Sequence, residues 1–468
     1  MTTEQSSPLP QSPESRFFQK VDWTSFGLTT LLVLAVYWLT LAPAVTLEYS
    51  GVYATGALHS SPSMPSGHPV WAVYGWLFTK SIPFSNIACR LSLASATAGA
   101  LACGLVALVV SRVGFLLAEE LPAFKSFSSR EQYASRLVCG VVAGLGLGFD
   151  RGFWGKAVVA DVWPLGLLLF ALTLCFLSQW FFAPQRKRYL FLAALFHGLT
   201  LSESQAFIPA TFAFPALLAF GDRKLGQQIF LTVTVCLVGI ILQQDLLDSL
   251  GWSISPTTRH ILIAAAFIAA LSWGGLWFST RRFFRGWKAA SGCAALFLAG
   301  LGFCFLLPIF SMTNPPINWG YPRTVEGFFH VLSRGQFASV DPTGNFRQLL
   351  MQWQIYGKIA LVDLGPLYLL AAALPFLLLH KVPPRPLRWL VGLLAVWFLI
   401  TLLTLAGLNV DSSGAQQIRP FFAPTHLILV LFAGFGLILL AGLLGNPHSA
   451  AIRRSTMGGA QPETDQDT

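Results

Sequence analysis

The sequence predicts an all-α fold, a polytopic membrane bundle of about 12 helical spans that resembles no soluble domain in composition. The chain has 468 residues, of which 54% are hydrophobic and only 11% are charged, and its mean hydropathy is +0.62. Soluble domains carry about a quarter charged residues. Apolar stretches of about 20 residues, each able to cross about 30 Å of hydrocarbon, recur along nearly the whole length.

The expected elements follow in order along the chain. Polar tails are expected at 1–20 and 446–468, both disordered and cytoplasmic, around one transmembrane domain at 21–445. The expected spans are 24–46, 91–111, 137–150, 157–183, 189–202, 205–220, 228–247, 260–279, 289–312, 358–380, 388–408 and 421–445. The short spans at 137–150, 189–202 and 205–220 are interpreted as tilted or half-membrane pieces. The first span starts late and is long, which favours a retained helix over a signal peptide.

The cysteines predict neither a disulfide framework nor a metal site. All seven fall inside apolar runs, where cysteine behaves as a small core residue. They are Cys89, Cys103, Cys139, Cys175, Cys236, Cys293 and Cys304.

The basic residues predict the orientation. With the N-terminus inside, 20 of the 30 Lys and Arg residues fall on the inner side, at every alternate connection. Such a bias is the positive-inside rule. It predicts both termini in the cytoplasm, an active face on the extracytoplasmic side, and a multi-pass protein of the kind found in a bacterial inner membrane. It also accounts for the net charge of +10 without a nucleic-acid partner.

Two long outer loops, at 47–90 and 313–357, are rich in aromatic residues, proline and glycine. Long loops on a rigid scaffold commonly carry function. We therefore expect the functional surface on this outer side, with short interfacial helices in both loops.

Acidic residues at the membrane boundary are the first candidates for chemistry. Glu48 follows the first span among apolar neighbours, where desolvation suits a general base or a ligand for a divalent cation. Its alternative role is to end a helix. Asp161 lies at the outer end of an apolar helix, a costly position for a charge, and is either functional or paired with Lys156. Glu203, between two short apolar runs, is explained by a polar turn but is expected on the same side.

Histidines and arginines in the outer loops are the second group. His59 and His68 are spaced irregularly, which favours polar loop contacts over metal ligation. Arg323 and Arg334, among aromatic and glycine residues, suit a phosphate beside a flat or lipidic group, and Arg419 is expected to join them. Contact with anionic lipid headgroups is the alternative role of these arginines.

Several separate motifs carry a resemblance to a known family. The first outer loop contains Pro43, Glu48-Tyr49-Ser50-Gly51, Pro65-Ser66-Gly67-His68-Pro69-Val70 and Asn86-Ile87-Ala88-Cys89-Arg90. Further motifs are Trp154-Gly155-Lys156-Ala157 with Asp161-Val162-Trp163-Pro164, Asn318-Trp319-Gly320-Tyr321-Pro322, and Arg334-Gly335-Gln336-Phe337. Together they resemble the DUF2723 membrane proteins, which include the TMEM260-type protein O-mannosyltransferases. The acidic pair of that family falls on Tyr49 and Val52 here, and Glu48 is the nearby acid.

The resemblance implies a GT-C glycosyltransferase fold and the reaction of such enzymes. In those enzymes a membrane bundle binds a polyprenyl-phosphate sugar, and an acid in the first outer loop serves catalysis. The implied reaction moves the sugar to a hydroxyl of a protein or glycan outside the cytoplasm. Whether the reaction uses a divalent cation as cofactor stays open from the sequence.

The residues expected to perform this reaction fall into three groups. The catalytic residues are Glu48 and Asp161, and the donor phosphate would be bound by Arg323, Arg334 and Arg419. The other substrate contacts are His68, Trp154, Glu203, Asn318, Trp319 and Gln336.

Two other classes of function remain open from the sequence. About 12 spans with both ends inside is also a common transporter or flippase topology, although charged residues within the spans are few and no two-half repeat is evident. A non-catalytic relative that binds a lipid-linked glycan is the third possibility.

Overall fold

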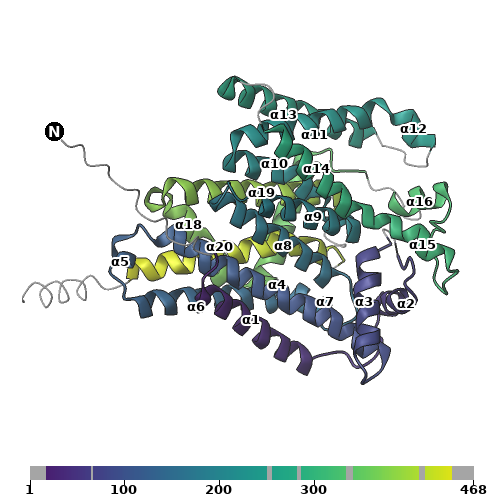
Figure 1. The fold of residues 1–468 in the computed structure, drawn as a ribbon, viewed down its shortest axis with the longest axis horizontal. Helices are drawn as coiled ribbons and strands as arrows, with labels where there is room; N and C mark the ends of the chain where they lie inside the picture. The colour runs from purple at the N-terminus through teal and green to yellow at the C-terminus, as the bar shows by residue number, and fades with distance from the viewer. Residues whose placement is uncertain are drawn as a thin grey trace, which may run out of the picture.

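The structure, a computed structural model, describes residues 17–64, 67–249, 256–281, 286–333, 341–410 and 417–444. Every element within these residues is a helix, which confirms the predicted all-helical class (Figure 1). The first elements are α1 (Lys20–Leu39), α2 (Ser50–His59), α3 (Pro69–Ser81), α4 (Ile87–Ala118), α5 (Pro122–Lys125), α6 (Ser129–Gly148) and α7 (Arg151–Ala157). There follow α8 (Trp163–Phe182), α9 (Lys187–Glu203), η1 (Gln205–Phe207), α10 (Ile208–Gly221), α11 (Arg223–Leu242), α12 (Gln244–Ser249), α13 (Pro256–Thr280) and α14 (Trp287–Leu301). The last are η2 (Gly302–Phe305), α15 (Leu306–Met312), α16 (Val325–Leu332), α17 (Phe346–Leu364), α18 (Pro366–Leu377), η3 (Leu379–Lys381), α19 (Pro384–Leu408), η4 (Arg419–Phe422) and α20 (Ala423–Leu444).

Eight helices in the described part of the chain are long and apolar enough to cross a membrane, or up to 10 if each bent pair is one span. This supports an integral membrane protein. The count of about 12 is not confirmed, because α9 and α10, with 17 and 14 residues, are short for a span of about 20 residues.

Two bends change the predicted boundaries. The run at 358–380 is not one continuous helix, because α17 and α18 meet at 111° around Gly365, whose φ of 81° few other residues adopt. The run at 157–183 becomes helical later than predicted, since α7 ends at Ala157 and α8 begins at Trp163. The second bend comes before this run, where α7 turns by 73° from α6. Hydrophobicity alone does not reveal either bend.

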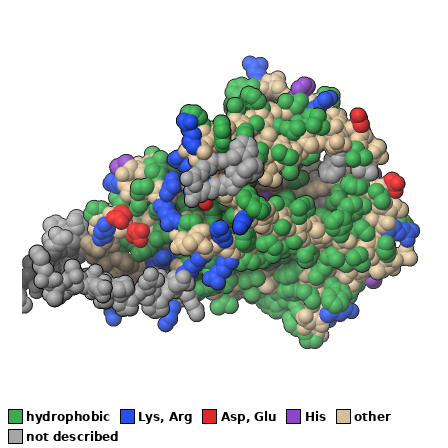
Figure 2. All heavy atoms as spheres, turned by 45° about the horizontal axis from the view of Figure 1, so that its top comes forward, with side chains coloured by type: hydrophobic (Ala, Val, Ile, Leu, Met, Phe, Trp, Pro, Cys, Tyr) green, Lys and Arg blue, Asp and Glu red, His purple; other side chains and the backbone are tan. Residues whose placement is uncertain are grey.

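Helix α4 forms the centre of the bundle, and 78% of its most apolar stretch is buried. It packs against α1, α6, α8 and α20. Small residues allow this close packing: a Cβ on Gly140 would lie 2.4 Å from Ser25 Oγ, and one on Gly144 would lie 2.7 Å from the Cys103 carbonyl oxygen. The helices α11 and α13 are peripheral, since only 28% and 11% of their most apolar stretches are buried. The face of the molecule in Figure 2 is predominantly hydrophobic.

Two residues of the first outer-loop motifs hold the backbone that precedes α4. Asn86 caps α4 by accepting a hydrogen bond from the Cys89 amide at 2.8 Å, and its Nδ2 donates to the Pro43 carbonyl at 2.8 Å. Arg90 donates only to backbone carbonyls, including that of Thr79 at 3.0 Å. These residues therefore shape the loop in which Glu48 lies.

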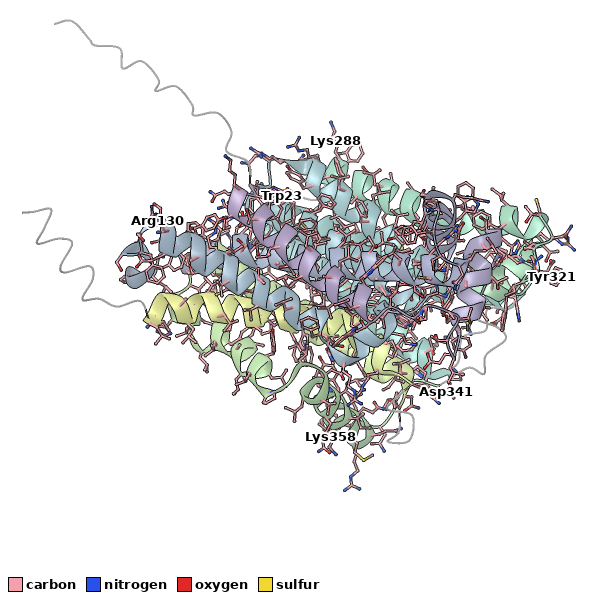
Figure 3. All side chains as sticks on the ribbon, turned by 90° about the horizontal axis from the view of Figure 1, so that it is seen from below. Trp23, Arg130, Lys288, Tyr321, Asp341 and Lys358 are labelled. Carbon is pink, nitrogen blue, oxygen red and sulfur yellow. The ribbon has the colours of Figure 1, made fainter. Side chains whose placement is uncertain are left out.

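The first long loop and the start of the second lie at one end of the molecule. Helices α2 and α3 lie at that end with α15 and α16, and α5 lies at the other (Figure 1). Tyr321 and Arg130 likewise mark opposite ends (Figure 3). The loops touch where the Trp319 amide donates to the Pro62 carbonyl at 3.1 Å. The sidedness of these ends relative to a membrane stays a prediction.

Candidate active site

Glu48, Lys156 and Asp161 form a continuous series of ion pairs. Lys156 Nζ lies 2.5 Å from Glu48 Oε2 and 3.4 Å from Asp161 Oδ2. The Ala42 amide donates to the Val158 carbonyl at 2.9 Å, which fastens the segment after α1 to the end of α7 and brings Glu48 beside Lys156. The two predicted catalytic acids therefore share one lysine.

Asp161 is buried and held on several sides in the connection between α7 and α8. Its side chain accepts a hydrogen bond from the Trp163 amide at 3.1 Å at the start of α8, and its backbone amide and carbonyl both bond to Ser95 Oγ. Burial raises the pKa of the Asp161 carboxyl above its usual range, and the Lys156 ammonium opposes that rise. The ion pair with Lys156, one of its two proposed roles, is present.

Glu48 differs from Asp161 in its exposure. Its side chain is 66% exposed, and the preceding Leu47 is 91% exposed. The desolvation that favoured a general base is therefore absent in this structure. The backbone of Glu48 has a φ of 66°, an uncommon conformation outside glycine that directs the chain into α2.

An open cleft of about 320 Å³ surrounds these charges. It is lined by Thr46, Leu47, Glu48, Tyr49, Ser50, Gly152, Gly155, Lys156, Val159 and Asp161. A volume of several hundred cubic ångströms matches small-molecule sites, which commonly range from about 300 to 1,000 Å³. The cleft thus gives a sugar-sized group access to both carboxylates and the lysine.

Glu203 and His68 lie together but serve the scaffold. Glu203 is fully buried, and its Oε2 accepts the Trp71 amide at 2.8 Å, near the N-terminus of α3. His68 Nδ1 lies 2.6 Å from the Glu203 carbonyl oxygen, and its ring meets Tyr53 edge-on. A carboxylate at a helix N-terminus is stabilising. His59, by contrast, is exposed.

The two predicted arginines that the structure describes, Arg419 and Arg323, do not converge. Arg419 packs over Gly152, which lines the cleft, and its Nε lies 3.3 Å from Asp363 Oδ1. Arg323 instead donates to Asn314 Oδ1 at 2.8 Å, and it does not line the cleft. Arg334 lies outside the described residues, as does Gln336.

The remaining predicted contacts support loops. Trp154 Nε1 donates to Thr40 Oγ1 at 3.2 Å, and Asn318 Nδ2 donates to the Ser311 carbonyl at 3.2 Å. Trp319 joins the two outer loops through its backbone, and its side chain is 37% exposed. None of these three side chains lines the cleft.

Sequence reasoning gave Lys156 only a structural role and assigned no role to Asp150, Asp363 or His426. Lys156 lies five positions before Asp161, a local signal that pointed to their pairing. His426 Nδ1 lies 2.7 Å from Asp150 Oδ2, although the two are far apart in the sequence. No local pattern reveals such a pair.

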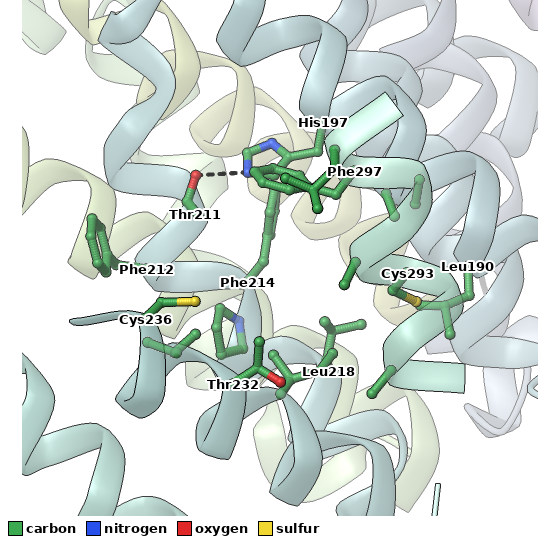
Figure 4. A pocket seen from close by; sticks show the side chains of 18 of the residues that line it. Leu190, His197, Thr211, Phe212, Phe214, Leu218, Thr232, Cys236, Cys293 and Phe297 are labelled. Carbon is green, nitrogen blue, oxygen red and sulfur yellow. Dashed lines mark hydrogen bonds between the residues drawn. The ribbon is translucent and has the colours of Figure 1, made fainter. Parts of the chain in front are cut away.

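A second, apolar cavity of about 450 Å³ lies between α8, α9, α10, α11 and α14 (Figure 4). Its lining is almost entirely hydrophobic. The polar contact that Figure 4 shows joins His197 Nε2 to Thr211 Oγ1 at 3.0 Å. Thr173, which also lines it, lies roughly 15 Å beyond Trp163, the first residue of α8, at 1.5 Å per residue.

Comparison with known proteins yields one family. Residues 50–227, less than half of the chain, match the model of the protein O-mannosyl-transferase TMEM260 N-terminal domain. No curated protein and no solved structure matches the chain. The matched segment includes Lys156, Asp161 and Glu203 and begins just after Glu48. The family description supports a glycosyltransferase role. Residues 50–227 are thus similar to the N-terminal domain of the TMEM260-type proteins, the family that the loop motifs resemble.

Proposed function

We propose that this chain is a membrane glycosyltransferase of the GT-C type. It moves a sugar from a polyprenyl-phosphate donor to a hydroxyl of a protein or glycan on the extracytoplasmic side. The observation that supports this most is the series Glu48–Lys156–Asp161 in an open cleft that the start of the first long loop lines. The match to a family described as a protein O-mannosyl-transferase supports the same class of reaction.

Glu48 is the proposed general base. An acceptor hydroxyl in the cleft gives its proton to Glu48 while its oxygen forms a bond to C1 of the sugar. The bond between C1 and the phosphate oxygen breaks, and its electron pair stays on the lipid phosphate. Attack opposite the leaving group inverts the configuration at C1. Because Glu48 is exposed, an acceptor can reach its carboxylate, and in this proposal the bound substrates, not the protein, remove water from it.

Lys156 is the proposed partner of the departing phosphate. Positioned cations stabilise charge that develops as a leaving group departs. Lys156 lies between the two carboxylates, so it reaches a phosphate in the cleft by leaving Glu48 while Asp161 still holds it. Arg419, packed over Gly152, supplies a second positive charge from the side of α20.

The apolar cavity is the proposed place for part of the lipid carrier. A polyprenyl chain is apolar and flexible, and this cavity is lined by hydrophobic side chains deeper along α8 than the cleft. Burial of apolar surface contributes about 25 cal/mol per Å². Contacts between the polyprenyl chain and this cavity would thus contribute to binding of the donor independently of its phosphate.

The test is sugar transfer by the purified full chain in lipid nanodiscs. Polyprenyl-phosphate sugars, mannose first, are supplied with a labelled sugar and a hydroxyl-bearing peptide, and labelled peptide is measured. Glu48→Gln removes the base with little change in size. We expect a loss on the order of 100-fold or more in kcat, because general bases contribute 10²–10⁴.

The matched control is Glu120→Gln. Glu120 is 56% exposed and pairs with Lys125 at 2.6 Å, so it reproduces the exposure and the lysine partner of Glu48 away from the cleft. It should transfer sugar like the wild type. Equal activity of both variants would remove Glu48 from the mechanism. A wild type that binds the donor but transfers nothing would instead identify a non-catalytic glycolipid-binding relative.

A further inference from the structure

Asp150, Asp363 and His426 come together from three separate helical segments beside the cleft. Asp150 precedes α7, Asp363 lies near the end of α17, and His426 lies in the first turn of α20. One possible ligand atom from each residue lies within 4.8 Å of the other two, and all three residues are buried. Buried carboxylates require a partner to be stable.

Several polar atoms of the cluster have no hydrogen-bond partner among the residues that the structure describes. Both carboxylate oxygens of Asp363 lack one, and so does Nε2 of His426, a residue that is 1% exposed. The Asp363 side chain is itself 1% exposed. Arg419 Nε lies 3.3 Å from Asp363 Oδ1, but this contact lacks hydrogen-bond geometry, and Nε also remains without a partner. The arginine therefore leaves the cluster unsatisfied.

His426 Nδ1 lies 2.7 Å from Asp150 Oδ2, close to the separation of two neighbouring ligand atoms on one metal ion. A metal ion between these two atoms would replace the proton that they share, and the neutral imidazole would keep its proton on Nε2. Asp150 in turn is fixed, because its Oδ1 accepts the Phe153 amide at 2.8 Å and caps α7.

A small cavity of about 10 Å³ adjoins the cluster. A cavity needs about 10–15 Å³ of this kind of volume to hold one water molecule or a particle of similar size. It is lined by Asp150, His426 and Arg419 but not by Asp363, and it shares Gly152 and Lys156 with the cleft. An ion at the cluster would therefore lie close to the proposed catalytic lysine and would compete with Arg419 for Asp363.

We propose that Asp150, Asp363 and His426 bind one first-row divalent metal ion, of the Mn²⁺ or Zn²⁺ class. Imidazole with carboxylates is a ligand set that such ions accept. Metal–ligand distances of about 2.0–2.2 Å place opposite ligands about 4.4 Å apart, so a separation of 4.8 Å closes with small side-chain rotations. The ion would join α7, α17 and α20 and fix the position of α7, which carries Lys156.

This site is independent of the proposed sugar transfer, and its test uses no sugar. The purified full chain is treated with EDTA, incubated with MnCl₂ or ZnCl₂, and desalted, and its metal content and melting temperature are measured. We expect one ion per chain and a higher melting temperature. Asp363→Asn and His426→Gln should lose both effects. His197→Gln, which changes another buried histidine in the apolar cavity, should keep them.

Two further measurements keep the proposal testable if a variant fails to fold. Wild-type protein with CoCl₂ should show the visible absorption of coordinated Co²⁺. Arg419→Gln removes a competing cation next to Asp363 and should tighten Mn²⁺ binding several-fold. A wild type that retains no metal and shows no Co²⁺ absorption overturns the site, as does equal metal content in wild type, Asp363→Asn and His426→Gln.

Discussion

Replacement of Lys156 by methionine tests the electrostatics of the cleft directly. The change removes the cation 3.4 Å from Asp161 Oδ2 and leaves a buried carboxylate without it. At 3.4 Å a unit-charge pair contributes about 1 kcal/mol at the dielectric constant of water and about 5 kcal/mol at an effective value of 20. The side chains are 21% and 7% exposed, so we expect Lys156→Met to lower the free energy of unfolding by about 2–3 kcal/mol near pH 8.

The same variant should be sensitive to pH in a defined direction. Burial already raises the pKa of Asp161, and loss of Lys156 raises it further, because the lysine opposes that rise. A raised carboxyl pKa contributes stability that is present at low pH and is lost as pH rises through the folded-state pKa. In acid the Asp161 carboxyl of Lys156→Met is neutral and needs no cation, so the variant should be nearly as stable as the wild type. As the pH rises the carboxyl ionises without its lysine, so the difference in stability between the two proteins should widen.

The assay is the melting temperature in detergent of both proteins across pH 5–9. Lys125→Met is the matched control, since Lys125 is 57% exposed in its pair with Glu120 and should contribute less than about 1 kcal/mol. A gap that does not change with pH, or no destabilisation at all, would refute the role assigned to the Lys156–Asp161 pair.

Two further predictions concern the scaffold. Glu203→Ala should destabilise the protein by about 1–3 kcal/mol, because the buried Trp71 amide loses its acceptor, whereas Glu203→Gln keeps an oxygen there and should cost less; equal losses of melting temperature in both variants would contradict this. Gly198→Ala should cost about 1–3 kcal/mol or more, since a Cβ there would lie 2.1 Å from the Phe297 carbonyl oxygen between α9 and α14. Gly239→Ala, with nothing within 4 Å, is its control, and similar melting of the two variants would argue against close packing of α9 and α14.

Hydrophobic periodicity and charge predicted much of the fold. The helical class and most span positions follow from them, because every backbone polar group in a membrane must be satisfied within its own helix. The span count does not follow. The bends after Gly148 and at Gly365 depend on local backbone conformation, and apolar composition continues through them.

The contacts of the candidate site were predicted in part. Contacts between residues close in the sequence could be predicted, and contacts between distant residues could not. Asp161 and Lys156 are close in the chain, so their ion pair was one of two roles considered. Glu203 was expected near the outer loops, but its bond to the Trp71 amide, 132 positions away, required the fold. The pair of Asp150 and His426, separated by 276 positions, left no signal in the sequence.

Transfer of the sugar with release of the carrier phosphate is the central claim, and a doubly labelled donor tests it most directly. Purified wild-type protein in sealed vesicles receives a polyprenyl-phosphate sugar labelled in the sugar and in the lipid, together with a peptide acceptor. The proposed reaction predicts one free polyprenyl phosphate for each sugar on the peptide, with inverted configuration at C1. A donor that crosses the bilayer with its sugar–phosphate bond intact would contradict transfer and identify a flippase.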